Sequence, residues 1–124
     1  MGRYYNGDIE GKFWFGIQAS NDADNFGQTG DTPNYLNYYF DKDDLPDVNK
    51  GIDKCLEALG EMKDKIDQYF EDKDGYNNRS MAKHFNITEN EVKEYLEYYA
   101  RLHLGEQIRD CINKTGECSF EAEL

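Results

Sequence analysis

Residues 80–99 read SMAKHFNITENEVKEYLEYY, and this stretch predicts two helices that meet at a sharp corner. The first helix is short, and Asn86 begins the tight turn that ends it. Thr88 stands where the second helix needs an N-cap, and Glu91 follows in the capping-box position. The sequence therefore predicts a helix-turn-helix-like pair over residues 79–113.

The chain that follows this pair predicts a strand. Thr115 and Gly116 form a turn signal, and apolar and polar residues then alternate over residues 117–124. Such alternation is typical of a strand with one buried and one exposed face. The apolar face needs a sheet to join, so a partner strand is expected elsewhere in the chain.

The clearest helical pattern lies before the pair, in residues 47–72. Asp47 is the expected N-cap of this helix. Gly51 and Gly60 each cost about 1 kcal/mol relative to alanine inside a helix. Both glycines therefore predict the close approach of a neighbouring element. Apolar residues recur at helical spacings and predict one stripe, which consists of Val48, Ile52, Cys55, Leu56, Leu59, Met62, Ile66, Tyr69 and Phe70.

Strands are also predicted near the start of the chain, in residues 3–19. Asn6 and Gly7 form the dipeptide that supplies a tight hairpin turn. Phe13 and Phe15 then share one face of an alternating aromatic segment, which favours a strand.

These elements together predict an α+β fold, arranged as a single domain over residues 1–124. A small antiparallel sheet is expected from an N-terminal hairpin in residues 3–19 and the C-terminal strand 117–124. We expect this sheet to pack against the long amphipathic helix 47–72 and the helix-turn-helix-like pair 79–113.

The chain is strongly acidic, with 14 basic residues against 26 acidic ones and a net charge of −12. Such a surface repels nucleic-acid backbones and anionic membranes, because proteins bind both through lysine and arginine. It favours a basic protein partner. No window of the sequence approaches the ~20 apolar residues that span a membrane.

The helix-turn-helix-like pair raises a nucleic-acid hypothesis that its own charges oppose. A DNA reader carries basic residues on its second helix, where they meet phosphates. Here Glu89, Glu91, Glu94 and Glu97 stand against Lys93 alone. Three interpretations stay open: a plain helical corner, a degenerate helix-turn-helix, and an acidic protein that mimics DNA and occupies a basic partner.

One loop begins like a calcium-binding loop. Asp22 and Asp24 take the first and third positions, but Phe26 takes the fifth and Pro33 the twelfth, where a bidentate glutamate is required. One interpretation is a weak cation site made by Asp22, Asp24 and Asp31. The other is a polar turn whose side chains bond to their own backbone.

The sequence contains no recognised pattern for catalysis, a cofactor or a transition metal. There is no glycine-rich phosphate loop and no nucleophile motif. His84 and His103 lack the spacing to cysteines or to each other that zinc sites use. We therefore predict no cofactor and no metal centre. The remaining enzyme hypothesis, which we favour less, places catalytic carboxylates beside Trp14.

Aromatic residues are abundant, at 15 % of the chain, and ten of them are tyrosines. Core packing accounts for many of them, but interfaces are also enriched in tyrosine, tryptophan and phenylalanine. Residues 35–40 form the densest cluster, as either a short helix or an edge strand. The candidate partner surface consists of Tyr35, Tyr38, Tyr39, Trp14, Glu89, Glu94 and Glu97.

Residues 2–16 read GRYYNGDIEGKFWFG, and Asp22-Ala23-Asp24 and Phe26-Gly27 follow them. This string resembles an uncharacterised family of small proteins from marine metagenomes and large aquatic viruses. The resemblance covers roughly the first 27 residues. The family has no assigned activity, so the resemblance implies no catalytic residue. It does imply an intracellular setting, in a virus-infected host cell.

Taken together, the sequence favours a non-catalytic protein–protein interaction or self-associating module. A homo-oligomer is expected, because symmetric assemblies are common among soluble proteins. The alternative is a nucleic-acid-linked protein, either a degenerate helix-turn-helix or an acidic DNA mimic. Cys55, Cys111 and Cys118 are odd in number and lie at apolar positions, which predicts reduced thiols and a cytoplasmic location.

Overall fold

The computed structural model describes residues 3–14, 17–28, 35–72 and 77–123, with the backbone alone at Tyr35 and Asp72. The fold is α+β, as predicted, with four helices and a four-stranded antiparallel sheet in the described part of the chain. The strands are β1 (Tyr4–Gly7), β2 (Gly11–Lys12), β3 (Tyr35–Asp41) and β4 (Glu117–Glu123). The helices are α1 (Leu45–Leu59), α2 (Met62–Asp72), α3 (Asn78–Phe85) and α4 (Glu89–Thr115), with short 3-10 helices η1 (Asp22–Phe26) and η2 (Lys42–Asp44).

The sheet has the order β2-β1-β4-β3, so the C-terminal strand lies between β1 and β3. The predicted alternation in β4 is confirmed, because Cys118, Phe120 and Ala122 are buried. The predicted pairing of the N-terminal and C-terminal strands is confirmed as well. The cluster at residues 35–40 forms an edge strand, which was one of its two predicted structures.

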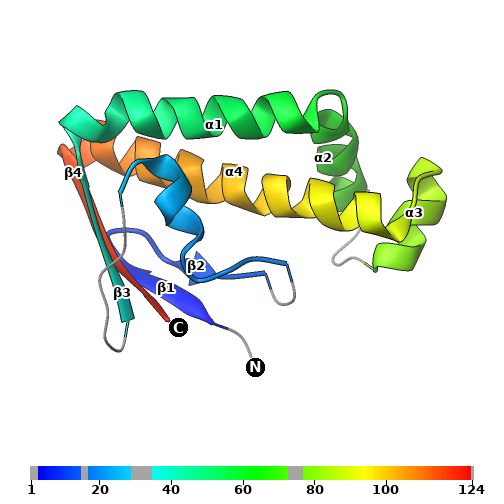
Figure 1. Cartoon of the computed structure of the whole chain (residues 1–124), viewed down its shortest axis with the longest axis horizontal. Coiled ribbons are helices and arrows are strands. Elements are labelled where there is room, and N and C mark those ends of the chain that lie inside the picture. Colours follow the sequence, from blue (N-terminus) through cyan, green and yellow to red (C-terminus); the bar gives the residue numbers. More distant parts are fainter. Residues whose placement is uncertain (1–2, 15–16, 29–34, 73–76, 124) are drawn as a thin grey trace.

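The helical layer consists mainly of α1 and α4, which lie side by side and run in opposite directions (Figure 1). The predicted corner before α4 is confirmed. Asn86 ends α3 with a φ of 58°, the left-handed conformation. The Thr88 hydroxyl then accepts a hydrogen bond from the N–H of Glu91 at 3.1 Å, and the Glu91 carboxylate accepts one from the N–H of Thr88 at 3.2 Å. This reciprocal capping box fixes the start of α4.

The prediction of one helix over residues 47–72 is wrong, because the chain breaks into α1 and α2. Gly60 separates them with a φ of 53° and a ψ of −130°, a backbone conformation that glycine adopts at least cost. Figure 1 shows that α2 turns away from the direction of α1. Both helices bury apolar residues in the same core, so the stripe continues across the break. The prediction is wrong at Leu56, which is 41 % exposed. Asp44, not Asp47, is the residue before α1.

The predicted strand that included Phe13 and Phe15 is also wrong. β2 covers only Gly11–Lys12, and the N–H of Gln18 donates to the carbonyl of Trp14 at 2.8 Å, which closes a turn. Phe13 packs against a ring of β1, whereas Trp14 packs against a ring of α2. The alternating aromatic residues therefore fill two separate packing sites and not the face of one strand. Phe15 itself lies outside the described residues.

Asn6 and Gly7 do not form the predicted hairpin turn. Both belong to β1 and pair with Glu121 and Phe120 of β4. A Cβ at Gly7 would lie 2.5 Å from the carbonyl oxygen of Ser119. The glycine is therefore required by the close approach of β4, and the turn itself comes later, before β2.

Two helical glycines make room for one aromatic ring. A Cβ at Gly51 of α1 would lie 2.6 Å from the Phe26 ring, and a Cβ at Gly105 of α4 would lie 2.4 Å from it. The ring is fully buried between the two helices. The predicted close approach at Gly51 is thus confirmed. At Gly60 it is wrong, because an added Cβ would meet nothing within 4 Å.

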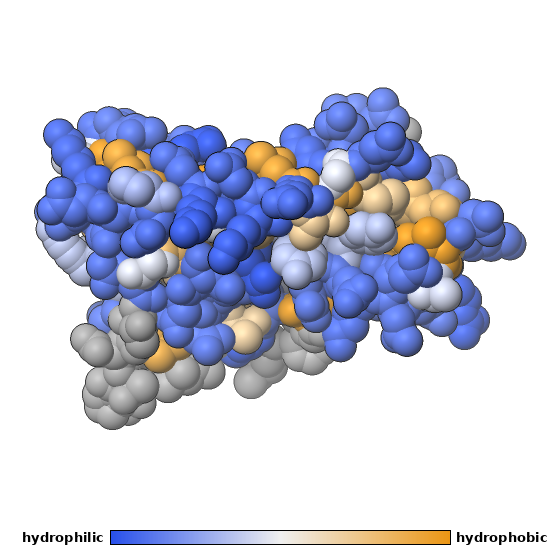
Figure 2. Space-filling view, turned by 45° about the horizontal axis from the view of Figure 1, so that its top comes forward, coloured by the Kyte–Doolittle hydropathy of each residue, from blue (hydrophilic) through white to orange (hydrophobic). Residues whose placement is uncertain are grey.

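One hydrophobic cluster contains side chains from the sheet and from all four helices. The face that α1 and α4 present is mostly hydrophilic, with apolar residues gathered toward the end where α2 and α3 lie (Figure 2). Within the described residues, no helix is long and apolar enough to cross a membrane.

Candidate interaction surface

The helices cover one face of the sheet, and the opposite face is exposed. This outer face carries two tyrosines, Tyr4 of β1 and Tyr39 of β3, whose side chains are 49 % and 48 % exposed. They are the two most exposed large hydrophobic residues in the described part of the chain. The other exposed residues on the outer face are Asn6, Lys12, Asn37, Glu117, Ser119 and Glu121, with Asp41 and Glu123 at its margins.

The strand register places acidic side chains between the two tyrosines. The N–H of Tyr4 donates to Oε2 of Glu123 at 3.3 Å, and Tyr39 lies opposite Ser119 of the same strand. β4 therefore presents its glutamates along the middle of the outer face. Lys12 is the one basic residue among the outer-face positions, and its Nζ lies 5.9 Å from the centroid of the Tyr4 ring. An ammonium group is thus already held on this face by an aromatic ring.

The Tyr39 hydroxyl is oriented by the acidic strand. It donates to Oε2 of Glu117 at 3.2 Å, across the diagonal of the β3–β4 register. This hydrogen bond and the charge of Glu117 raise the pKa of Tyr39, and Asp41 and Asp44 act in the same direction. Tyr39 therefore presents a half-exposed ring with its hydroxyl directed at a carboxylate.

Among the described residues, β3 has a free edge beside this face. Its inner edge pairs with β4 from Tyr35 to Asp41, and no described residue pairs with the other edge. Strands of this kind expose backbone N–H and C=O groups that can bind a further extended segment. Asn37 and Tyr39 are the exposed side chains along the described part of this strand.

The predicted aromatic residues do not share one surface. Tyr38 is 2 % exposed and its hydroxyl donates to Oδ1 of Asp24 at 2.5 Å, so it belongs to the core. Trp14 is half-buried and packs edge-on against Phe70. Of the three whose side chains are described, Tyr39 is the one that is largely exposed. The side chain of the fourth residue, Tyr35, lies outside the described residues.

The predicted acidic residues of α4 lie apart from the sheet. Glu89 and Glu94 are exposed at the end of α4 that meets α3, away from the strands (Figure 1). Glu97 is half-buried and lines a cavity of about 390 Å³ beside η1. The fold therefore separates the predicted acidic residues from the exposed Tyr39 of the sheet.

The predicted calcium-like loop forms the 3-10 helix η1, and its carboxylates are hydrogen-bonded within the fold. Asp22 is 4 % exposed; its Oδ1 accepts from Nε of Arg101 at 2.7 Å and its Oδ2 from the amide of Gln18 at 2.7 Å. Asp24 accepts from the hydroxyl of Tyr38. No group of three potential metal ligands occurs among the described residues, and Asp31 lies outside them.

The ion pair between Asp22 and Arg101 was not predicted from the sequence. It joins η1 to α4, far apart in the chain, and no local spacing indicates it. Burial of the carboxylate is compensated by its hydrogen bonds, as a buried charge requires. The glycine at position 105, one turn further along α4, is the sequence feature that indicates close packing of another element against this part of the helix.

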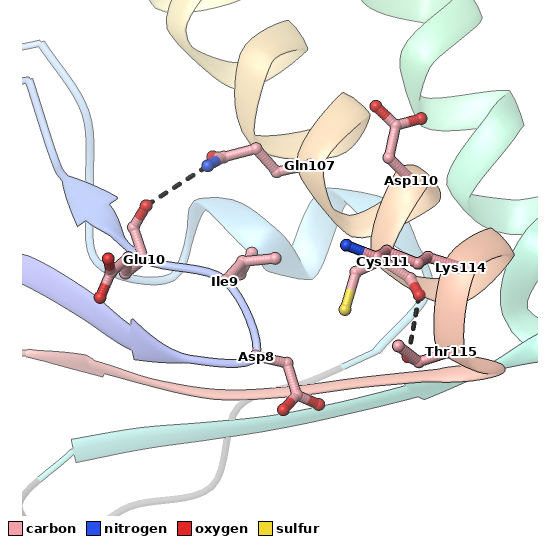
Figure 3. A pocket seen from close by; sticks show the side chains of 8 residues that line it. All are labelled: Asp8, Ile9, Glu10, Gln107, Asp110, Cys111, Lys114 and Thr115. Atoms are coloured by element: carbon pink, nitrogen blue, oxygen red, sulfur yellow. Dashed lines mark hydrogen bonds between the residues drawn. The ribbon is translucent and has the colours of Figure 1, made fainter.

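A cavity of about 500 Å³ lies between the turn after β1 and the end of α4 (Figure 3). Asp8, Glu10 and Asp110 give its lining an acidic character, and Lys114 is its one basic lining residue. Gln107 of α4 points toward Glu10, and its amide donates to the carbonyl of Glu10 at 3.3 Å (Figure 3).

Comparisons of this chain with protein-family models, with curated proteins and with solved structures found no significant match.

Proposed function

We propose that this chain is a non-catalytic interaction module that binds a basic protein partner on the outer face of its sheet. The observation that carries the proposal is the arrangement of Tyr4 and Tyr39 on either side of the acidic strand β4. Tyrosine is enriched at protein interfaces, and its rings attract ammonium and guanidinium groups. Carboxylates beside such rings favour the same cationic partner.

The shape of the bound segment follows from the free edge of β3. An extended segment could pair with this edge and extend the sheet, with alternate side chains over the outer face. Basic side chains at those positions would lie beside Tyr39 of β3 and extend across it toward Glu117 and Glu121 of β4. The backbone would supply affinity and the charges would supply specificity and a faster encounter rate.

Self-association is the second candidate, and the same free edge favours it. Two copies of β3 could pair antiparallel about a two-fold axis, which is the commonest symmetry of homo-oligomers. The net charge of −12 opposes close contact between two copies, so we rank a basic partner first. Analytical ultracentrifugation at several salt concentrations distinguishes the two: salt strengthens self-association of like charges and weakens binding of a basic partner.

The alternative is a nucleic-acid-linked protein, in which the acidic residues imitate the phosphates of DNA. An acidic face could occupy the phosphate-binding surface of a nucleic-acid-binding protein, and the exposed acidic end of α4 could do so as well. Direct reading of DNA by α3 and α4 is the weaker form, because Glu89, Glu91 and Glu94 are all exposed there. A salt-titrated DNA-binding assay tests this form, and binding that weakens as salt rises would favour it.

A displayed library of random twelve-residue peptides tests the main proposal. We expect the selected peptides to be rich in lysine and arginine at alternate positions. On titration of such a peptide into the ¹⁵N-labelled protein, the amide signals of β3 and β4 should shift most. Selected peptides without basic residues, or shifts confined to α3 and α4, would contradict the proposal.

A further inference from the structure

Two of the three cysteines lie side by side where α4 ends. Cys111 is in the last turns of α4 and Cys118 is the second residue of β4. Gly116 between them has a φ of 91°, and this left-handed residue turns the chain back at the helix end. Sγ of Cys111 donates to the carbonyl oxygen of Glu117 at 3.3 Å, directly before Cys118.

The two thiols differ in access. Cys118 is fully buried, whereas Cys111 is half-buried and lines the acidic cavity. Figure 3 shows the Cys111 sulfur directed from α4 toward the strands and into the space beside Ile9. Burial raises the pKa of the Cys118 thiol, and the neighbouring Cys111 thiol raises it further. A reagent from solution therefore meets Cys111 first.

We propose that Cys111 and Cys118 are a modification site, at which a small disulfide is reduced and the two cysteines join in an intramolecular disulfide. Cys111 is the residue that the reagent reaches, and Cys118 is the residue that completes the bond. The bond would tie the end of α4 to the central strand of the sheet. This proposal stands on the cysteine geometry and does not depend on the proposed partner surface.

The exchange balances in two steps. Cys111 loses its proton and attacks one sulfur of a reagent R–S–S–R, so a Cys111–S–S–R bond forms and one R–SH leaves with that proton. Cys118 then loses its proton and attacks the Cys111 sulfur, which forms the Cys111–Cys118 bond and releases the second R–SH. The protein loses two electrons and two protons, and the reagent gains them.

The cavity lining selects the charge of the reagent. Asp8, Glu10 and Asp110 outnumber Lys114, so a cationic disulfide is attracted and an anionic one is repelled. At low salt we expect cystamine, which is cationic, to react about tenfold faster than oxidised glutathione, which is anionic. Salt should reduce this difference. Equal rates at low salt would overturn the cavity as the route of entry.

Mass spectrometry after treatment with cystamine tests the disulfide itself. The wild-type chain should lose two of its three thiols. Trypsin cleaves after Arg109 and Lys114, so the bond should link the peptide of residues 110–114 to the peptide that begins at Thr115. A cysteamine adduct that persists on Cys111 of the wild type, or a bond between two chains, would overturn the proposal.

Single substitutions test the role of each of the three cysteines. Cys111→Ser should form neither adduct nor disulfide, and Cys118→Ala should stop as a stable cysteamine adduct on Cys111. Cys55→Ala is the matched control and should form the disulfide as the wild type does, because Cys55 lies in α1 and is buried. Formation of an intramolecular disulfide by Cys111→Ser would overturn the assignment.

Phenylarsine oxide tests the contact without oxidation and without a variant. It binds two thiols that lie side by side, and excess dithiol removes it whereas monothiol does not. We expect one bound molecule for each wild-type chain under reducing conditions. Absence of dithiol-specific binding would show that the two sulfurs do not meet.

Discussion

The hydroxyl of Tyr39 donates to Oε2 of Glu117 at 3.2 Å, on the solvent side of the sheet. The two residues are diagonal neighbours, because Tyr39 lies opposite Ser119 in the register of β3 and β4. This contact orients a half-exposed aromatic ring beside the free edge of β3 and over an acidic strand. The proposed partner surface is built around it.

The first prediction concerns the titration of Tyr39. The hydrogen bond to Glu117, followed by the charge of its carboxylate, raises the pKa of Tyr39 above its ordinary value of 10.0. We therefore expect Glu117→Gln to lower the pKa of Tyr39, as followed by ¹³C NMR of the tyrosine rings. Glu94→Gln, which is exposed on α4, is the control and should leave that pKa unchanged. A Tyr39 titration that is the same in Glu117→Gln as in the wild type would refute the contact.

The second prediction concerns the buried ion pair. Asp22→Ala leaves the Arg101 guanidinium without its carboxylate and removes the acceptor for Gln18. We expect the free energy of unfolding to fall by about 2 kcal/mol, as measured by urea denaturation, because the partly buried guanidinium and the buried Gln18 amide both lose their acceptor.

A surface pair provides the control for this measurement. Nε of Arg109 lies 3.0 Å from Oδ1 of Asp110, whose side chain is exposed. Asp110→Asn should change stability by less than about 0.5 kcal/mol, because exposed ion pairs contribute little. If Asp22→Ala had as small an effect, the ion pair would not anchor η1 to α4.

The third prediction concerns the contact between α4 and η1. Gly105→Ala adds a methyl group whose carbon would lie 2.4 Å from Cε1 of Phe26. We expect a loss of about 2 kcal/mol of stability from overpacking, although alanine is the better helix former. In a Phe26→Leu background the same substitution should cost much less, because the ring atoms that it meets are gone. An equal cost in both backgrounds would mean that Phe26 is not the limiting neighbour.

The fourth prediction concerns stability at acid pH. Burial acts to raise the pKa of Asp67, but hydrogen bonds from Lys63 and Tyr99 outweigh it, so the folded-state pKa lies below the ordinary 3.8. A carboxyl whose pKa is lowered by folding stabilises the fold above its unfolded pKa. That stabilisation is lost as the pH falls through the folded pKa, below about pH 4.

The Tyr99 hydroxyl, which donates to Oδ1 of Asp67 at 2.5 Å, allows a direct test. Tyr99→Phe should lower the free energy of unfolding by about 1 kcal/mol at pH 7, and by less at an acid pH below the folded-state pKa of Asp67. Tyr95→Phe is the control and should show no such pH dependence. The same loss for Tyr99→Phe at both pH values would contradict the role of Asp67.

Local signals in the sequence predicted the parts of the fold that local chemistry decides. The capping box at Thr88, the turn at Asn86 and the alternation after Gly116 each depend on neighbouring residues, and all three are confirmed. The break at Gly60 escaped prediction because both flanking helices share one core, and apolar periodicity does not record a change of direction.

The candidate surface was predicted only in part, for a similar reason. Which tyrosines of residues 35–40 are exposed depends on the register with β4, and the sequence gives no register between distant strands. Tyr39 was named together with Tyr38, yet the pleat buries one and exposes the other. The glutamates of β4 were read as the polar side of a strand. These glutamates lie between Tyr4 and Tyr39 because β4 lies between β1 and β3, and the sequence does not specify this strand order.

The affinity of two charge-matched variants for a selected basic peptide tests the proposed function most directly. Glu117→Gln with Glu121→Gln removes two charges from the outer face of the sheet. Glu89→Gln with Glu94→Gln removes two from the exposed end of α4, so both variants have the same net charge. We predict that isothermal titration calorimetry will show about tenfold weaker binding for the sheet variant, a loss of about 1.4 kcal/mol, and near wild-type binding for the α4 variant. Equal losses in both variants would mean that net charge alone attracts the peptide, and would contradict a partner site on the sheet.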